Sequence, residues 1–297
     1  MKDEQRIQIA YYPGCSLHAS SQLYDIQCKL VCDLLGIELR EIEDWNCCGA
    51  AAASKTSDFL AVALPARNLG IVSAMGLSEV VIPCSSCYSR TVVAQKTLSL
   101  KTESKQSIEA NLDYKIHDAI RVFNMLEIFA ERVGMDALAG KVVRKLSGLR
   151  PACYYGCLLT RFPDEIDIND DVENPQTMEL LCETVSAEPI DWNYKTDCCG
   201  ASGAFYNAEQ SERLISRIIQ DALMRGANCI VTSCPLCQFN VDVYQTKPAE
   251  KYRSAKRLPV YFITEILGLS IGIHAEQMQM NQHLVDAVGL LKELKLL

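Results

Sequence analysis

Ten cysteines of this chain repeat one pattern of spacing twice. The first copy consists of Cys15, Cys47-Cys48-Gly49 and Cys84-Ser85-Ser86-Cys87, and the second of Cys157, Cys198-Cys199-Gly200 and Cys234-Pro235-Leu236-Cys237. The flanking residues repeat as well, because Tyr11-Tyr12-Pro13-Gly14-Cys15 corresponds to Tyr154-Tyr155-Gly156-Cys157. A single Cys-x-x-Cys is shared by zinc sites, redox pairs and chance. A set of five cysteines that occurs twice indicates a specific ligand-binding function.

The chemistry of these thiols points to metal. A cytosolic chain keeps its cysteines reduced, and adjacent cysteines such as Cys47-Cys48 rarely form a disulfide with each other. Thiolate is a soft ligand that suits zinc or iron–sulfur clusters. Zinc sites and ordinary cubane clusters both take four ligands, whereas each set offers five cysteines. The surplus indicates either a larger or irregular cluster, or four ligands and one spare, and the sequence leaves both open.

Glycines stand directly beside the expected ligands. Gly49 and Gly200 follow the double cysteines and have no Cβ, so backbone N–H groups can approach inorganic sulfur there. Such donors raise the reduction potential of a cluster. His18 lies near the first set and is a candidate proton donor to a departing thiolate, with a surface or core histidine as the alternative.

The remaining cysteines are Cys28, Cys32, Cys153, Cys182 and Cys229. Cys28 and Cys32 are one helical turn apart and could form a metal-binding face, although buried structural thiols are the commoner outcome. The same buried role is expected of Cys182 and Cys229. Cys153 precedes Cys157 on an expected strand, and its role is open between a neighbour of the second site and a core residue.

The elements around the cysteines alternate between strands and helices. In the first half we expect strands at 7–13, 37–42 and 80–83, with helices at 20–35 and from Ser57-Asp58 to about Met75. This order is typical of a parallel α/β layer. Ligands of such sheets collect outside the carboxyl ends of the strands, which is where all three cysteine groups of this half fall.

The second half repeats the plan after a connecting region. Residues 99–113 are expected to be a linker, and 118–133 a long amphipathic helix that bridges the halves. We then expect strands at 152–155, 187–192, 230–232 and 259–262, and helices from Asn174-Pro175 to about Val185, at 211–225 and at 281–296. The acidic segment 163–173 is expected to be a solvated loop. The predicted fold class is therefore α/β, with two pseudo-symmetric halves that each hold a small parallel sheet with flanking helices.

The predicted domain organisation is a first half at 1–98, a linker and bridging helix at 99–148, and a second half with a C-terminal helix at 149–297. A net charge of −8 argues against a nucleic-acid binder, which would show a basic face. The first residues are charged and polar rather than a basic-then-apolar leader, and no apolar run approaches ~20 residues. We expect a cytoplasmic protein, and association with a membrane through partners stays open.

The repeated motifs resemble the CCG-domain, or cysteine-rich-domain, family, and within it the B subunit of heterodisulfide reductase. The matching segments are Tyr11-Tyr12-Pro13-Gly14-Cys15-Ser16-Leu17-His18, Trp45-Asn46-Cys47-Cys48-Gly49-Ala50, Tyr155-Gly156-Cys157-Leu158-Leu159, Cys198-Cys199-Gly200-Ala201 and Cys234-Pro235-Leu236-Cys237. The likeness covers nearly the whole chain.

This resemblance implies two noncubane [4Fe-4S] clusters and no flavin in this chain. One cluster would be held by Cys15, Cys47, Cys48, Cys84 and Cys87, and the other by Cys157, Cys198, Cys199, Cys234 and Cys237. Members of the family receive electrons from a flavin-containing partner through a ferredoxin-like one, both within the reductase complex. They split a small-molecule disulfide between the clusters. In methanogenesis this disulfide is the mixed disulfide of coenzyme M and coenzyme B. The implied function is that of a disulfide oxidoreductase within a larger complex.

Two other functions stay open. Similar chains with two CCG copies accompany succinate or fumarate dehydrogenases and exchange electrons with quinones, so an electron-relay subunit is the principal alternative. A zinc protein without redox turnover is a weaker one. The sequence names neither the disulfide nor the direction of electron flow.

Overall fold

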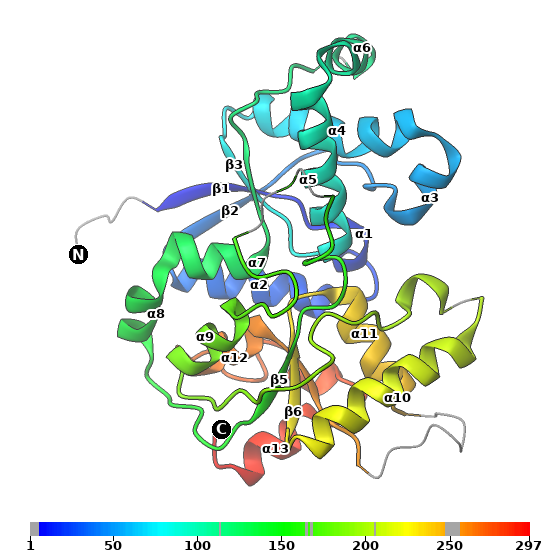
Figure 1. The fold of residues 1–297 in the computed structure, drawn as a ribbon. Helices are drawn as coiled ribbons and strands as arrows, with labels where there is room; N and C mark the ends of the chain where they lie inside the picture. The colour runs from blue at the N-terminus through cyan, green and yellow to red at the C-terminus, as the bar shows by residue number, and fades with distance from the viewer. Residues whose placement is uncertain (1–5, 113, 164–165, 167–168, 205, 247–255) are drawn as a thin grey trace.

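The protein is described here by a computed structural model that covers residues 6–112, 114–163, 166, 169–204, 206–246 and 256–297. It contains two separate parallel sheets flanked by helices (Figure 1). The first sheet has the order β2-β1-β3-β4, with β1 (Ile7–Tyr11), β2 (Ile37–Glu41), β3 (Glu79–Val81) and β4 (Arg121–Phe123). The second has the order β5-β6-β7, with β5 (Pro151–Tyr154), β6 (Cys229–Thr232) and β7 (Val260–Phe262). The predicted fold class is confirmed.

The helices of the first half follow the expected alternation. They are α1 (Gly14–Leu17), α2 (Gln22–Leu34), α3 (Ala50–Thr56), α4 (Asp58–Ala74), α5 (Ser85–Leu100) and α6 (Thr102–Leu112). The predicted start of α4 is confirmed, because the Ser57 side chain accepts a hydrogen bond from the Leu60 N–H. The predicted linker at 99–113 is wrong, since α6 fills most of it. Its polar sequence hid the helix because Ile108 is its one buried residue.

The predicted helix at 118–133 is also wrong at its start. Residues 121–123 form β4, which pairs with β3 and completes the first sheet. The helical part begins only after Asn124, whose side chain accepts from the Leu126 and Glu127 N–H groups while the Glu127 carboxylate accepts from the Asn124 N–H. It continues as α7 (Met125–Glu127), the π-helix η1 (Ile128–Gly134) and α8 (Met135–Lys141).

The second half contains α9 (Thr177–Thr184), the 3-10 turn η2 (Ala201–Gly203), α10 (Ala208–Met224), α11 (Pro235–Tyr244), α12 (Ile263–Ser270), the 3-10 turn η4 (Met280–Gln282) and α13 (Ala287–Glu293). The segment predicted as a strand at 187–192 runs beside β5 through two backbone hydrogen bonds, Glu188 N–H to Leu149 O and Ile190 N–H to Pro151 O. It is not a strand. It nevertheless takes the place beside β5 that β2 takes beside β1.

The starts of α9 and α13 differ from the prediction because Asp170 and Asp286 accept hydrogen bonds from their first N–H groups. The Asp170 carboxylate accepts from the Gln176 and Thr177 N–H groups at the start of α9, so Asn174-Pro175 is not its cap. The acidic segment is thus partly a capping structure, and four of its residues lie outside the described ones. The terminal helix is shorter than predicted because Asp286 caps it by accepting from the Val288 and Gly289 N–H groups.

The two halves share one core across their boundary. Helix α2 of the first half packs against α12 of the second, and α9 of the second packs against η1 and α8 (Figure 1). The Tyr24 and Phe262 rings stack with their centroids 3.9 Å apart. The Gln27 amide donates to a Glu265 carboxylate oxygen at 2.9 Å. None of the helices in the described residues combines the length and apolar character needed to cross a bilayer. The exact domain boundaries stay a prediction.

Candidate metal centres

The first set of cysteines gathers beyond the carboxyl ends of β1 and β3. Cys15 lies in α1 directly after β1, and Cys84 is the N-cap of α5 directly after β3. The Cys87 thiol hydrogen-bonds with both Cys48 and Cys84, and Cys15 hydrogen-bonds with Cys47. Cys48, Cys84 and Cys87 are buried, whereas Cys15 and Cys47 are exposed. The structure therefore brings the five predicted residues together with one edge open to solvent.

The second set repeats this arrangement beyond β5 and β6. Cys234 is the N-cap of α11, and the Cys199 and Cys237 sulfur atoms are 3.8 Å apart. Cys157 hydrogen-bonds with Cys198, and Cys237 with Cys234. Cys199, Cys234 and Cys237 are buried, whereas Cys198 is exposed and Cys157 is half-buried. Both sets have the same layered order from solvent to core.

In three pairs of these thiols, hydrogen bonding lowers the pKa of one member and raises that of its partner, which is Cys87, Cys157 or Cys237. A hydrogen bond from Cys87 lowers the pKa of Cys48 to about 7. A bond with Cys157 lowers the pKa of Cys198 to about 6, and one with Cys237 lowers that of Cys234 to about 6. The thiolate is the form that binds metal. Backbone N–H groups add to the effect, since Ala50 N lies 3.4 Å from the Cys48 sulfur and Gly200 N lies 3.3 Å from that of Cys198.

The glycines before the first cysteine of each set make room for sulfur. A Cβ on Gly14 would lie 2.8 Å from the Cys87 sulfur, and one on Gly156 would lie 2.8 Å from that of Cys237. Both glycines also have positive φ, +71° and +68°. The cradle around each set therefore tolerates no side chain at these positions. The space between the thiols fits a bound group. The repeated Gly-Cys pair, Gly14-Cys15 and Gly156-Cys157, is the sequence feature that indicates this space.

We predict that Gly156→Ala abolishes metal binding at the second set. The added methyl group displaces Cys237, so iron per chain after anaerobic purification is expected to fall to about half. Gly226→Ala is the matched control, because Gly226 has a similar φ of +87° but open space around its Cβ position. Equal iron in the two variants would show that backbone strain, and not the lost cradle, explains any effect.

The two sets approach each other at the boundary between the halves. Ser85, which follows Cys84 of the first set, lies beside the Cys234 thiol of the second and lines the pocket around that set. The Tyr24 hydroxyl donates to the Ser233 carbonyl at 2.9 Å across the same boundary. The Ser85 and Ser233 hydroxyls are buried and have no hydrogen-bond partner among the described residues. Orphaned donors beside thiols are suited to inorganic sulfide, which accepts such bonds.

The structure also places the other sequence candidates. Cys28, Cys32, Cys182 and Cys229 are fully buried, as expected of structural thiols. Cys153 hydrogen-bonds with Cys182 in the core, and burial raises its pKa. Its surroundings are core residues. The His18 ring lies 3.0 Å from a Glu41 carboxylate oxygen in a half-exposed pair and meets the Trp45 ring edge-on. The described contacts of the His18 side chain are thus those of a surface histidine, with Glu41 and Trp45.

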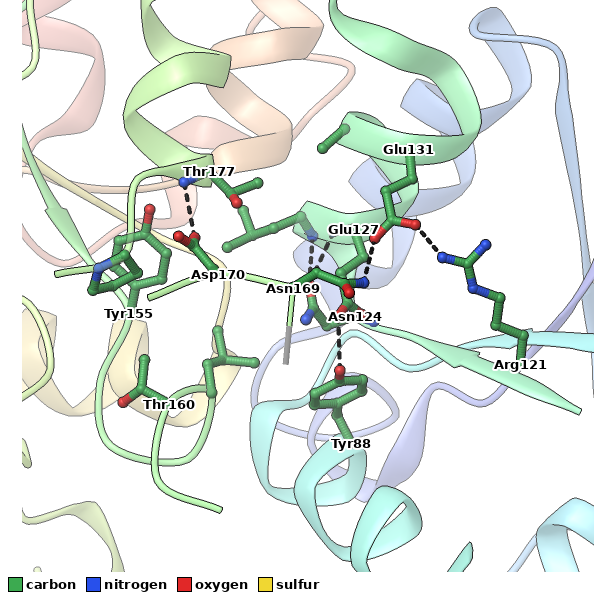
Figure 2. A pocket seen from close by; sticks show the side chains of 14 residues that line it. Tyr88, Arg121, Asn124, Glu127, Glu131, Tyr155, Thr160, Asn169, Asp170 and Thr177 are labelled. Carbon is green, nitrogen blue, oxygen red and sulfur yellow. Dashed lines mark hydrogen bonds and ion pairs between the residues drawn. The ribbon is translucent and has the colours of Figure 1, made fainter. Parts of the chain in front are cut away.

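A cavity of about 330 Å³ lies between the halves and is lined by residues of both (Figure 2). Tyr88, which follows Cys87, lines one side, and Tyr155, two residues before Cys157, lines the other. Tyr155 also lines the pocket at the second set. The Tyr88 hydroxyl donates to Glu127 at 2.9 Å, and burial raises the pKa of Glu127 to about 7. Sequence reasoning missed Glu127 within the predicted bridging helix, although Asn124-x-x-Glu127 has the capping-box spacing.

Comparison with known proteins defines the class. The model of the CCG cysteine-rich domain matches residues 9–90 and 152–242, the two segments that carry the two cysteine sets. The chain belongs to the CCG cysteine-rich domain family. Over 285 residues it is 31% identical to the 8-methylmenaquinol:fumarate reductase membrane anchor subunit of Wolinella succinogenes, covering 95% of this chain and 99% of that one.

A second relative comes from an archaeon. The chain is 25% identical over 295 residues to the B subunit of the ferredoxin:CoB-CoM heterodisulfide reductase of Methanosarcina mazei, covering 97% of each chain. Among solved structures, a hypothetical protein from Helicobacter pylori is similar with a TM-score of 0.76 and 13% identity, covering 93% of this chain and 51% of that one. This last likeness shows the fold alone. The sequence resemblance to the reductase family is thus confirmed.

Proposed function

We propose that the chain is an iron–sulfur electron-transfer subunit of a larger oxidoreductase complex, with one noncubane [4Fe-4S] cluster in each set. The proposed ligands are Cys15, Cys47, Cys48, Cys84 and Cys87 for the first cluster, and Cys157, Cys198, Cys199, Cys234 and Cys237 for the second. Thiolate ligands suit iron–sulfur chemistry, and the cradles and orphaned hydroxyls fit inorganic sulfide.

Within this class we propose an electron relay between a quinol and a flavoprotein of the succinate or fumarate dehydrogenase kind. The observation that carries this choice is the order of the two sets. Each has an exposed cysteine on the outside and a buried N-cap cysteine on the inside, and the inner cysteines approach each other through Ser85. Electrons can pass from one set to the other where the inner cysteines approach, and leave at an exposed edge. The relative that is named a methylmenaquinol:fumarate reductase anchor subunit supports the same choice.

The bound clusters would supply transfer of one electron at a time. The residues of the chain do the rest. Backbone N–H groups of Ala50 and Gly200 stabilise negative charge on the thiolates, which raises the reduction potential. The buried N-cap cysteines keep water away from the crossing point, and exposed Cys47 and Cys198 leave the outer edges reachable by partners. Membrane contact, on this proposal, is through the partners and the quinol.

Disulfide reduction is the second candidate. The closeness of the two sets at Ser85 is also what cleavage of a disulfide between two clusters needs, because each half of the bond must be stabilised. The 25% identical relative from Methanosarcina mazei is named as part of such a reductase. In this case the partners would be a ferredoxin-like protein and a flavoprotein of the same complex, and the substrate a small disulfide.

One experiment tests the class and separates the two candidates. We expect about eight irons and eight sulfides per chain after anaerobic purification, with little zinc. In the complex, a relay is reduced by a naphthoquinol and leaves disulfides intact, whereas a disulfide reductase turns over a disulfide. Four irons or fewer in folded protein would contradict the two-cluster proposal, and iron-free protein with zinc would contradict the class.

A further inference from the structure

The internal repeat holds a carboxylate at the same place in each half. Glu127 and Glu265 both lie at the third position of the helix after the last strand of their sheet. Each accepts the N–H of the residue before its helix, from Asn124 at 2.7 Å and from Phe262 at 2.8 Å. One oxygen of each carboxylate therefore accepts an equivalent backbone hydrogen bond. The two differ in what surrounds the other oxygen.

In the second half that oxygen is enclosed by the protein. It accepts from the Gln27 amide at 2.9 Å and from the His283 ring at 2.7 Å, and both members of the Glu265–His283 pair are fully buried. The stacked rings of Tyr24 and Phe262 close the space beside it. Both partners of this oxygen are thus protein groups, and the charge of the carboxylate is balanced by the histidine when His283 is protonated.

In the first half the same oxygen faces the cavity between the halves. Its protein partner is the Tyr88 hydroxyl, and the cavity continues past it to Tyr155 and Thr160 (Figure 2). Thr160 is buried, 3% exposed, and its hydroxyl has no partner among the described residues. A buried hydroxyl without a partner is costly unless a ligand or water satisfies it. The Glu265 carboxylate is therefore bonded to protein groups on both oxygens, whereas the equivalent Glu127 carboxylate borders a partly polar cavity.

The lining of the cavity selects by charge. Glu127, Glu131 and Asp170 contribute carboxylates, and Arg121, the one basic side chain among the described lining residues, already pairs with Glu131 (Figure 2). An anionic ligand, such as a sulfonated or phosphorylated disulfide, would meet like charges. The apolar lining residues Leu126, Ala130, Leu159 and Pro175 suit the faces of a ring. The volume lies within the usual range of small-molecule sites, which is roughly 300–1,000 Å³.

We propose that this cavity binds the neutral hydroquinone head group that supplies the electrons, and that the Glu127 carboxylate accepts its hydroxyl proton. This inference rests on the proposed relay function and adds to it the site and the proton acceptor. Oxidation of a hydroquinone to a quinone breaks two O–H bonds and releases two electrons and two protons. The bound clusters would take up the electrons one at a time, and the first proton goes to Glu127. The second follows after Glu127 has passed the first to solvent.

The surroundings of Glu127 make it suited to this exchange. Burial raises its pKa to about 7, while the Asn124 N–H and the Tyr88 hydroxyl oppose that rise. The charged groups that also act on it are Glu131, which raises the pKa, and Arg121, which lowers it. A base whose pKa lies near the working pH exchanges protons in both directions most readily. The neighbouring π-helix η1, which holds Glu131, is of a kind that is frequent at functional sites.

The test uses the full chain with its clusters in the complex, and 2-methyl-1,4-naphthoquinol as the probe. In Glu127→Gln we expect quinol-driven cluster reduction, followed by stopped-flow absorbance, to slow by about 100-fold or more. The wild-type rate should rise with pH through about 7, because the carboxylate is the accepting form, and the variant should lose this rise. Reduction by dithionite should be unchanged. Asp136→Asn, an exposed acid on α8, is the matched control and should keep both rate and pH profile.

A second variant tests occupancy without turnover. Ala130→Phe fills the cavity and should abolish binding of oxidised 2-methyl-1,4-naphthoquinone in equilibrium dialysis, at unchanged iron content. An unchanged rate and pH profile in Glu127→Gln, or full binding in Ala130→Phe, would overturn the site while leaving the relay function standing. Failure of the quinol to reduce the wild-type clusters, when dithionite does reduce them, would overturn the relay function and this inference together.

Discussion

Replacing Cys48 or Cys199 by alanine is expected to remove one cluster each and to stop electron transfer through the chain. The two residues are equivalent buried cysteines of their sets, and each hydrogen-bonds with the second cysteine of its Cys-x-x-Cys pair. Iron should fall from about eight to about four per chain in each variant. If the clusters act in series, transfer from quinol to flavoprotein is lost in both, because an electron has to visit both sets.

The same variants separate relay from disulfide cleavage. In a relay, the surviving cluster nearer the quinol is still reduced by it in one of the two variants, and anaerobic spectroscopy of that single cluster measures this. In a disulfide reductase, both variants lose all disulfide turnover. Cys182→Ala, a buried thiol outside the two sets, is the control for core damage and should retain all its iron. Full turnover in either cluster variant would contradict both two-cluster mechanisms.

Removing the buried carboxylate of Glu265 is expected to cost about 3–5 kcal/mol of the free energy of unfolding, because His283 and Gln27 lose their partner. Glu265→Ala therefore tests the boundary between the halves, which this network crosses. The measurement is the urea midpoint of the cluster-loaded chain under anaerobic conditions. Asp33→Ala, which breaks the half-exposed pair with Arg6, is the matched control and should change stability by about 1 kcal/mol or less. Equal shifts in the two variants would contradict a structural role for the buried network.

The effect of Glu265 should depend on pH with a defined sign. Burial by itself would lower the pKa of His283, but the nearby Glu265 carboxylate outweighs it and raises that pKa. A raised folded pKa means that the stabilisation is complete below the unfolded histidine value of about 6.5 and is lost as pH rises through the folded value. The difference between wild type and Glu265→Gln should accordingly shrink towards alkaline pH. A difference that grows with pH would show that the histidine is neutral in the pair.

Much of the fold could be predicted because local patterns and the repeat agreed. The strand at Ile7–Tyr11 and the helix starting after Ser57 have their signals within a few residues. The cysteines that follow β1, β3 and β6 were expected at the carboxyl ends of strands, and the structure places them there. The assignment of the repeated thiols to metal binding rests on their spacing and stays a prediction.

The parts that could not be predicted depend on contacts far apart in the sequence. The first N–H groups of α9, those of Gln176 and Thr177, donate to the Asp170 carboxylate, whereas the sequence predicted a cap by the adjacent Asn174-Pro175. The three residues of β4 lie within an apolar pattern that is typical of a helix. They form a strand because they pair with β3. The cavity with Glu127 arises where the two halves meet, so no stretch of sequence contains it.

The sharing of α2 between the halves has a consequence for the order of events during synthesis. All five cysteines of the first set lie within the first third of the chain, as does α2. The inner face of α2, with Tyr24 and Gln27, is covered by Phe262 and Glu265, which leave the ribosome near the end of translation. The inner face of α2 therefore stays uncovered until α12 has been made, and the first half reaches its final packing only when the chain is nearly complete.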